Sequence, residues 1–169
     1  MSLNDRLRDD LTAAMRSRDA LRRDTLRMVQ SAAYSVEKEK RRPLTDEELV
    51  AVLGREVKTR RESVEAFRAG GREDLAAKEE AEIALLVPYL PEQLSEDEVR
   101  DLVTEAIAAT GATSARDMGK VMGWLSPKTR GRADGKRVSE LVAQALASSD
   151  LSTHAGAHAG AAPGPASEG

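Results

Sequence analysis

A run of spaced cations interrupted by glycines is the part of this sequence most suited to chemistry. From Arg116 to Arg137 there are seven Lys or Arg against two Asp, a net charge of about +5 in a chain that totals −3. A positive region on an acidic protein commonly marks where a polyanion binds, and phosphate backbones are the usual partner. The predicted contact residues are Lys120, Lys128, Arg130, Gly131, Arg132, Gly135, Lys136 and Arg137.

The glycines of this segment favour the same interpretation. Glycine allows a backbone to approach a ligand closely, and the amides at a helix N-terminus carry partial positive charge. The alternative is a mobile, solvated connection between two helices, whose charges serve only solubility. Composition alone leaves both interpretations open.

A nucleoside triphosphate site is not expected here. The spacing from Gly131 to Gly135 and Lys136 is one residue short of the Gly-x4-Gly-Lys pattern, and Arg137 stands where Ser or Thr would coordinate magnesium. Trp124, beside the cations, could stack on a base, but a single Trp that follows a Met pair more commonly fills a small core.

The remaining polar residues do not predict catalysis, a metal or a cofactor. The acids Glu79, Glu80 and Glu82 have no histidine near them and point in successive helical directions, and the chain has no cysteine. His154 and His158 lie in a Gly/Ala-rich segment that should not fold. Charges such as Glu56 and Arg60, four residues apart, are interpreted as pairs on solvated helix faces.

The composition predicts an all-α protein, because Ala, Glu, Arg and Leu favour helix and no strand-like alternation recurs. Thr45 with Glu48, and Ser95 with Glu98, have the spacing of capping boxes, and Asp134 is a candidate N-cap. Leucine and valine periodicity predicts an N-terminal unit of four helices over about 3–17, 19–41, 45–69 and 72–87.

Prolines at 88 and 91 predict a hinge, since neither permits a continuous helix. Three further helices should follow, the middle one short and ending before the cations. The expected organisation is a helical domain over 1–88, a three-helix domain over 89–149, and a disordered tail over 150–169 rich in Ala, Gly and Ser. With no signal-like N-terminus and no long apolar run, we expect a cytoplasmic protein that does not enter membranes.

Several strings resemble the GatB/YqeY family, in particular the stand-alone YqeY-like proteins, and the likeness covers about residues 3–147. These strings are Gly70-Gly71-Arg72, Tyr89-Leu90-Pro91, Gln93-Leu94-Ser95, Thr110-Gly111-Ala112, Asp117-Met118-Gly119-Lys120-Val121-Met122 and Gly131-Arg132-Ala133-Asp134-Gly135-Lys136. The family is similar to the C-terminal tail of GatB, the subunit of the tRNA-dependent amidotransferase, and that tail is an all-helical module that contacts tRNA.

The resemblance implies a tRNA-binding accessory protein in a family associated with carbon–nitrogen ligase activity that uses glutamine as amide donor. The chain lacks the catalytic cradle of GatB and a glutaminase part, so we expect no ligase chemistry from this chain alone and no cofactor. The alternative is a helical protein-interaction subunit of an amidotransferase or aminoacyl-tRNA synthetase, with no RNA contact.

Overall fold

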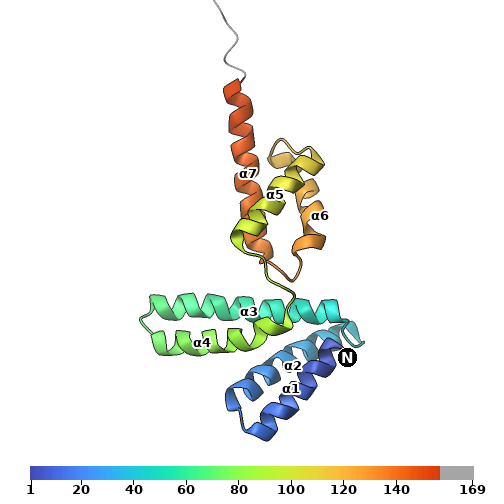
Figure 1. The fold of residues 1–169 in the computed structure, drawn as a ribbon, viewed down its shortest axis with the longest axis vertical. Helices are drawn as coiled ribbons and strands as arrows, with labels where there is room; N and C mark the ends of the chain where they lie inside the picture. The colour runs from blue at the N-terminus through green and yellow to red at the C-terminus, as the bar shows by residue number, and fades with distance from the viewer. Residues whose placement is uncertain (157–169) are drawn as a thin grey trace, which may run out of the picture. The chain divides into compact units, whose positions relative to one another are not determined.

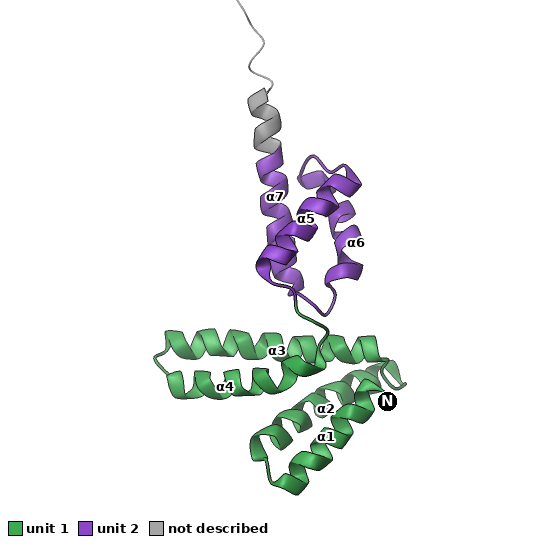
Figure 2. Ribbon diagram, in the orientation of Figure 1, with its two compact units in different colours: residues 1–93 green, residues 94–169 purple. Residues whose placement is uncertain are grey.

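A computed structural model of the chain describes the backbone of residues 1–156 and the side chains of residues 1–149, and this part is helical without any strand (Figure 1). The predicted all-α class is confirmed. Two compact units divide the chain at Gln93 and Leu94 (Figure 2). Tyr89, predicted to begin the second domain, is buried in the core of the first unit.

The first unit contains four α-helices followed by a short 3-10 turn. They are α1 (Leu3–Ser17), α2 (Ala20–Lys40), α3 (Asp46–Ala69), α4 (Glu73–Leu86) and η1 (Val87–Tyr89). The capping box of Thr45 and Glu48 is confirmed: the Thr45 hydroxyl accepts from the Glu48 amide and the Glu48 carboxylate accepts from the Thr45 amide. Caps of this kind satisfy amides that have no partner within the helix, so they set where each helix begins.

Aliphatic side chains from all four helices form the core of this unit. Its buried members are Leu3, Leu7, Leu26, Val29, Leu49, Leu53, Val57, Leu86 and Tyr89. The Tyr89 hydroxyl donates a hydrogen bond to the Asp10 carboxylate, which ties the end of the unit back to α1. Burial and this hydrogen bond raise the pKa of Tyr89 to about 12, so its hydroxyl stays protonated at neutral pH.

A buried ion cluster joins α3 to α4. Arg60, only 4% exposed, donates from Nε to Glu82 at 2.8 Å and from Nη1 to Glu56 at 2.7 Å. Its Nη2 lies 3.6 Å from the sulfur of Met28 on α2. The predicted pair with Glu56 is present, but the interpretation of Arg60 as part of a solvated face is wrong, because Glu82 on α4 binds it in the interior.

The second unit contains three α-helices and one 3-10 turn within the described residues. They are α5 (Glu96–Thr110), η2 (Ala115–Asp117), α6 (Met118–Thr129) and α7 (Gly135–Gly156). The capping box of Ser95 and Glu98 is confirmed, and Gly111 ends α5 with a left-handed backbone, φ 68°. Buried Val and Leu from the three helices form a separate core, among them Val103, Val121 and Leu125.

Two helices of this unit are longer than the sequence predicted. Helix α6 runs through Pro127 to Thr129. Proline has no backbone N–H to donate, so the helix lacks one hydrogen bond at Pro127. Because Pro127 lies only two residues before the end of α6, this loss affects only the last turn. Helix α7 continues to Gly156, past the predicted start of the disordered tail at 150, and the rest of that prediction, 157–169, lies outside the described residues.

Candidate nucleic-acid interface

Part of the cationic segment forms a tight turn between α6 and α7, which we call the basic turn, residues 130–134. The amides of Arg132 and Ala133 both donate to the Thr129 carbonyl, at 2.9 and 3.0 Å. The Arg132 carbonyl accepts from the Leu94 amide at 2.8 Å. The backbone of the turn is therefore held by hydrogen bonds to the end of α6 and to the segment before α5.

Gly131 is the one residue of the basic turn with a left-handed backbone, φ 73°. We expect Gly131→Ala to lower the free energy of unfolding of the second unit by about 1–2 kcal/mol, since a Cβ is strained in this conformation. Gly135→Ala is the matched control and should be nearly neutral, because φ is not positive there and a Cβ would meet no atom within 4 Å. Urea unfolding followed by the fluorescence of Trp124 measures both, and equal stability of the two variants would contradict this account.

Three cations around the basic turn are exposed to solvent: Lys128, Arg130 and Lys136. Within the described residues, the side chains of Arg130 and Lys136 form no ion pair or hydrogen bond. The Lys128 ammonium lies 3.9 Å from the centre of the Trp124 ring, in a cation–π contact. The structure thus brings three positive charges together at the end of α6, the turn and the start of α7.

Two other predicted residues have partners within the protein. Arg132 donates from Nη1 to the Lys128 carbonyl at 3.4 Å, where it caps the end of α6. Arg137 binds Glu96 at 2.6 Å and Glu140 at 3.1 Å, so it joins α7 to α5. The hydrogen bond between Arg137 and Glu96 raises the pKa of Arg137 and lowers the pKa of Glu96. Arg137 therefore has a structural role, and its contact with RNA stays a prediction.

Lys120 is separated from the other candidates. It lies in the first turn of α6, with its ammonium 3.8 Å from the Asp117 carboxylate. Eight residues of helix place it about 12 Å along the axis from Lys128. Only an extended polyanion could contact both.

The start of α7 is less available to a ligand than the sequence suggested, and Trp124 packs against the core, as the sequence favoured. The Asp134 carboxylate accepts from the Lys136 amide at 3.3 Å, which confirms Asp134 as the N-cap and supplies this helix end with its own anion. Trp124 is half-buried against the core, with Lys128 over its ring. We therefore expect phosphates to contact the cationic side chains of this region, and neither the amides at the start of α7 nor the Trp124 ring.

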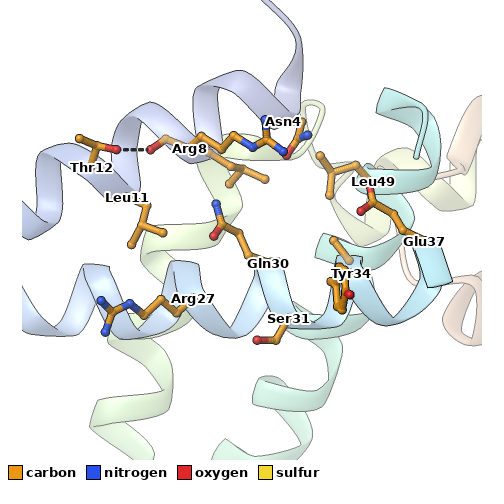
Figure 3. A pocket seen from close by; sticks show the side chains of 12 residues that line it. Asn4, Arg8, Leu11, Thr12, Arg27, Gln30, Ser31, Tyr34, Glu37 and Leu49 are labelled. Atoms are coloured by element: carbon orange, nitrogen blue, oxygen red, sulfur yellow. Dashed lines mark hydrogen bonds between the residues drawn. The ribbon is translucent and has the colours of Figure 1, made fainter. Parts of the chain in front are cut away.

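The sequence predicts no individual site residue in the first unit, yet a groove of about 710 Å³ opens there between α1 and α2 (Figure 3). Its walls carry polar residues at helical spacing, for example Asn4 and Arg8 on α1, and Arg27 and Gln30 on α2. This i, i+3 and i+4 recurrence beside the leucine stripe was visible in the sequence. The sequence does not give the register of the two helices, and this register determines which polar residues face one another.

In the described part of the chain, no group of three or more His, Cys, Asp or Glu is arranged to hold a metal ion. None of the helices in this part is long and apolar enough to cross a membrane.

The described part of the chain is that of a small all-helical protein with exposed cations around the basic turn. Residues 4–146 match the model of a family described as YqeY-like protein, and the chain belongs to that family. The resemblance inferred from the sequence motifs is thereby confirmed.

Three curated proteins from fungi are similar to this chain. The chain is 33% identical over 130 residues to "Altered inheritance of mitochondria protein 41, mitochondrial" of Pyrenophora tritici-repentis, covering 76% of this chain and 71% of the relative. It is 35% identical over 89 residues to an uncharacterized protein of Schizosaccharomyces pombe, covering 53% of this chain and 72% of the relative. A protein of Eremothecium gossypii with the same name as the first is 33% identical over 85 residues, which cover 50% of this chain and 46% of that relative. The names of two of these relatives place them in mitochondria, and the cytoplasmic location of this chain stays a prediction.

Proposed function

We propose that this protein binds tRNA through Lys128, Arg130, Arg132 and Lys136, as an accessory protein related to tRNA amidation. The observation that carries the proposal is the convergence of exposed cations around a turn whose backbone is held by hydrogen bonds. Lys128, Arg130 and Lys136 form no ion pair with any described residue, so their charges can neutralise phosphates and release condensed counterions. The similarity of the YqeY-like family to the tRNA-contacting tail of GatB supports tRNA as the RNA.

The contacts proposed here are to the phosphate backbone. Lys128, Arg130 and Lys136 present charge, and the Trp124 ring is covered by Lys128. Backbone contacts position a nucleic acid without reading its sequence. We therefore expect similar affinity for tRNAs of different sequence, with the choice of tRNA made by a partner enzyme.

Fluorescence anisotropy of labelled tRNA at increasing salt tests the proposal. Three to four phosphate contacts predict that log K falls with log salt concentration at a slope of about −3 to −4. A DNA duplex of equal length and a tRNA with a different anticodon serve as comparisons. No binding at low salt, or binding that salt does not weaken, would contradict the proposal.

The alternative, a helical protein-interaction subunit of an amidotransferase or synthetase, is favoured by one observation. Four large apolar side chains of α1 and α2 are exposed in the first unit, and exposed apolar area can mark a protein interface: Met15, Leu21, Met28 and Tyr34. A pull-down with the full chain distinguishes the two functions. A protein partner retained after nuclease treatment, together with absence of tRNA binding, would favour the alternative.

A further inference from the structure

The groove between α1 and α2 in the first unit, hereafter the α1–α2 groove, has the size of a small-molecule site. Its volume of about 710 Å³ lies within the range of about 300–1,000 Å³ that ligand pockets span. Gln30 points into the space between the helices, with Arg8 and Asn4 on the α1 side and Arg27 and Tyr34 on the α2 side (Figure 3).

This groove contains polar side chains whose hydrogen-bonding groups have no partner among the described residues. The side-chain amides of Asn4 and Gln30 are half-buried and make no hydrogen bond with the residues that the structure describes. Each amide offers a donor beside an acceptor. The leucines at the floor, Leu7 and Leu49, are already buried, so a helix with a large apolar face would gain little there.

The groove also carries two arginines that form no ion pair. Neither Arg8 nor Arg27 pairs with an acid among the described residues, and they come from opposite walls. The Arg27 Nη2 lies 3.9 Å from the sulfur of Met15. Glu37 is the acid of the lining, and its carboxylate accepts from the Leu44 amide at 3.2 Å. Two guanidinium groups are therefore available to an anionic ligand.

Tyr34 supplies an aromatic surface in the same groove. Its side chain is 62% exposed, unusual for a large aromatic residue of a folded helix. The Lys38 ammonium lies 5.9 Å from the centre of the ring. An exposed ring in a groove with hydrogen-bonding amides is suited to stack on a planar heterocycle.

We propose that the α1–α2 groove binds an adenine nucleotide. The base stacks on Tyr34, Gln30 and Asn4 bind its donor–acceptor edge, and Arg8 and Arg27 bind the phosphate. Amide side chains match adenine, which offers a donor next to an acceptor, whereas the corresponding edge of guanine offers two acceptors. The nucleotide is a free mononucleotide or an unpaired adenosine of an RNA. The site lies wholly in the first unit, so it does not depend on the function proposed for the basic turn.

Titration of the ¹⁵N-labelled full-length protein with AMP, followed by NMR, tests the proposal. We expect the side-chain amide signals of Asn4 and Gln30 to shift and saturate, with GMP binding more weakly. Tyr34→Ala should weaken binding by about 5- to 150-fold, as expected for the loss of one stacked base. Tyr34→Phe keeps the ring and should bind like the wild type.

Arg8→Ala should weaken binding of AMP more than that of adenosine, and Arg16→Ala, on the same helix but outside the groove lining, should change neither. A single-stranded oligoadenylate distinguishes the two sources: saturation by AMP alone indicates a free nucleotide, whereas the same shifts only with the oligomer indicate RNA. Lys128→Glu, outside the first unit, should bind AMP normally whether or not it binds tRNA.

Three results would overturn the proposal. The first is that neither AMP nor the oligoadenylate shifts the Asn4 and Gln30 amides. The second is that the shifts persist unchanged in Tyr34→Ala and Arg8→Ala. The third is that an acidic amphipathic peptide fills the groove while nucleotides do not.

Discussion

Replacing Arg60 with methionine should lower the free energy of unfolding of the first unit by about 3–5 kcal/mol, the largest effect we expect from one substitution. Methionine keeps much of the volume but removes the guanidinium that binds Glu82. Glu82 is only 8% exposed, so its charge would be left in the interior without a partner. Urea unfolding followed by far-ultraviolet circular dichroism measures the loss, and the fluorescence of Trp124, in the second unit, should report an unchanged transition.

Arg68→Met is the matched control, because Arg68 lies on the same helix and also binds two acids, Glu73 at 3.2 Å and Glu80 at 2.6 Å. Arg68 is 46% exposed, so solvent screens its ion pairs and its loss should cost far less than the loss of Arg60. The double variant Arg60→Met with Glu82→Leu should recover most of the loss, since no unpaired charge then remains buried. Similar losses for Arg60→Met and Arg68→Met would show that burial does not set the energy of these pairs.

Reversing the three exposed cations Lys128, Arg130 and Lys136 to glutamate should weaken tRNA binding by about 100-fold or more at low salt. Three attractive phosphate contacts become repulsive, and the salt slope should fall by about three. All three side chains are exposed and none supports the core, so the helical content and Tm should change little. Anisotropy with labelled tRNA measures the affinity.

The same net charge change can be made in the first unit. Arg16, Arg55 and Arg61 are exposed there, and their reversal to glutamate should weaken tRNA binding far less. If this control variant loses as much affinity as the first, binding depends on net charge alone, and the basic turn has no special role.

The features predicted correctly from the sequence are those determined locally. The capping boxes at Thr45 and Ser95 each depend on a residue three positions later, and hydrophobic periodicity located the helices. Arg60 shows where this reasoning ends. Its neighbour four residues before, Glu56, was identified, whereas Glu82 lies 22 residues away on another helix and becomes a partner only through packing.

The candidate site follows the same rule. The concentration of charge around Arg130 is a local property of the sequence, and the structure keeps it together. The pairing of Arg137 with Glu96, 41 residues away, depends on how α5 meets α7. The α1–α2 groove likewise needs the register of two helices, which sequence spacing alone does not provide.

Crosslinking of bound tRNA to the full-length protein, with the crosslinked peptides identified by mass spectrometry, is the most direct test of the central claim. The account predicts that crosslinks concentrate in residues 128–137 and disappear at high salt. Failure to retain tRNA at low salt would contradict it. So would crosslinks confined to other parts of the chain, including the α1–α2 groove alone.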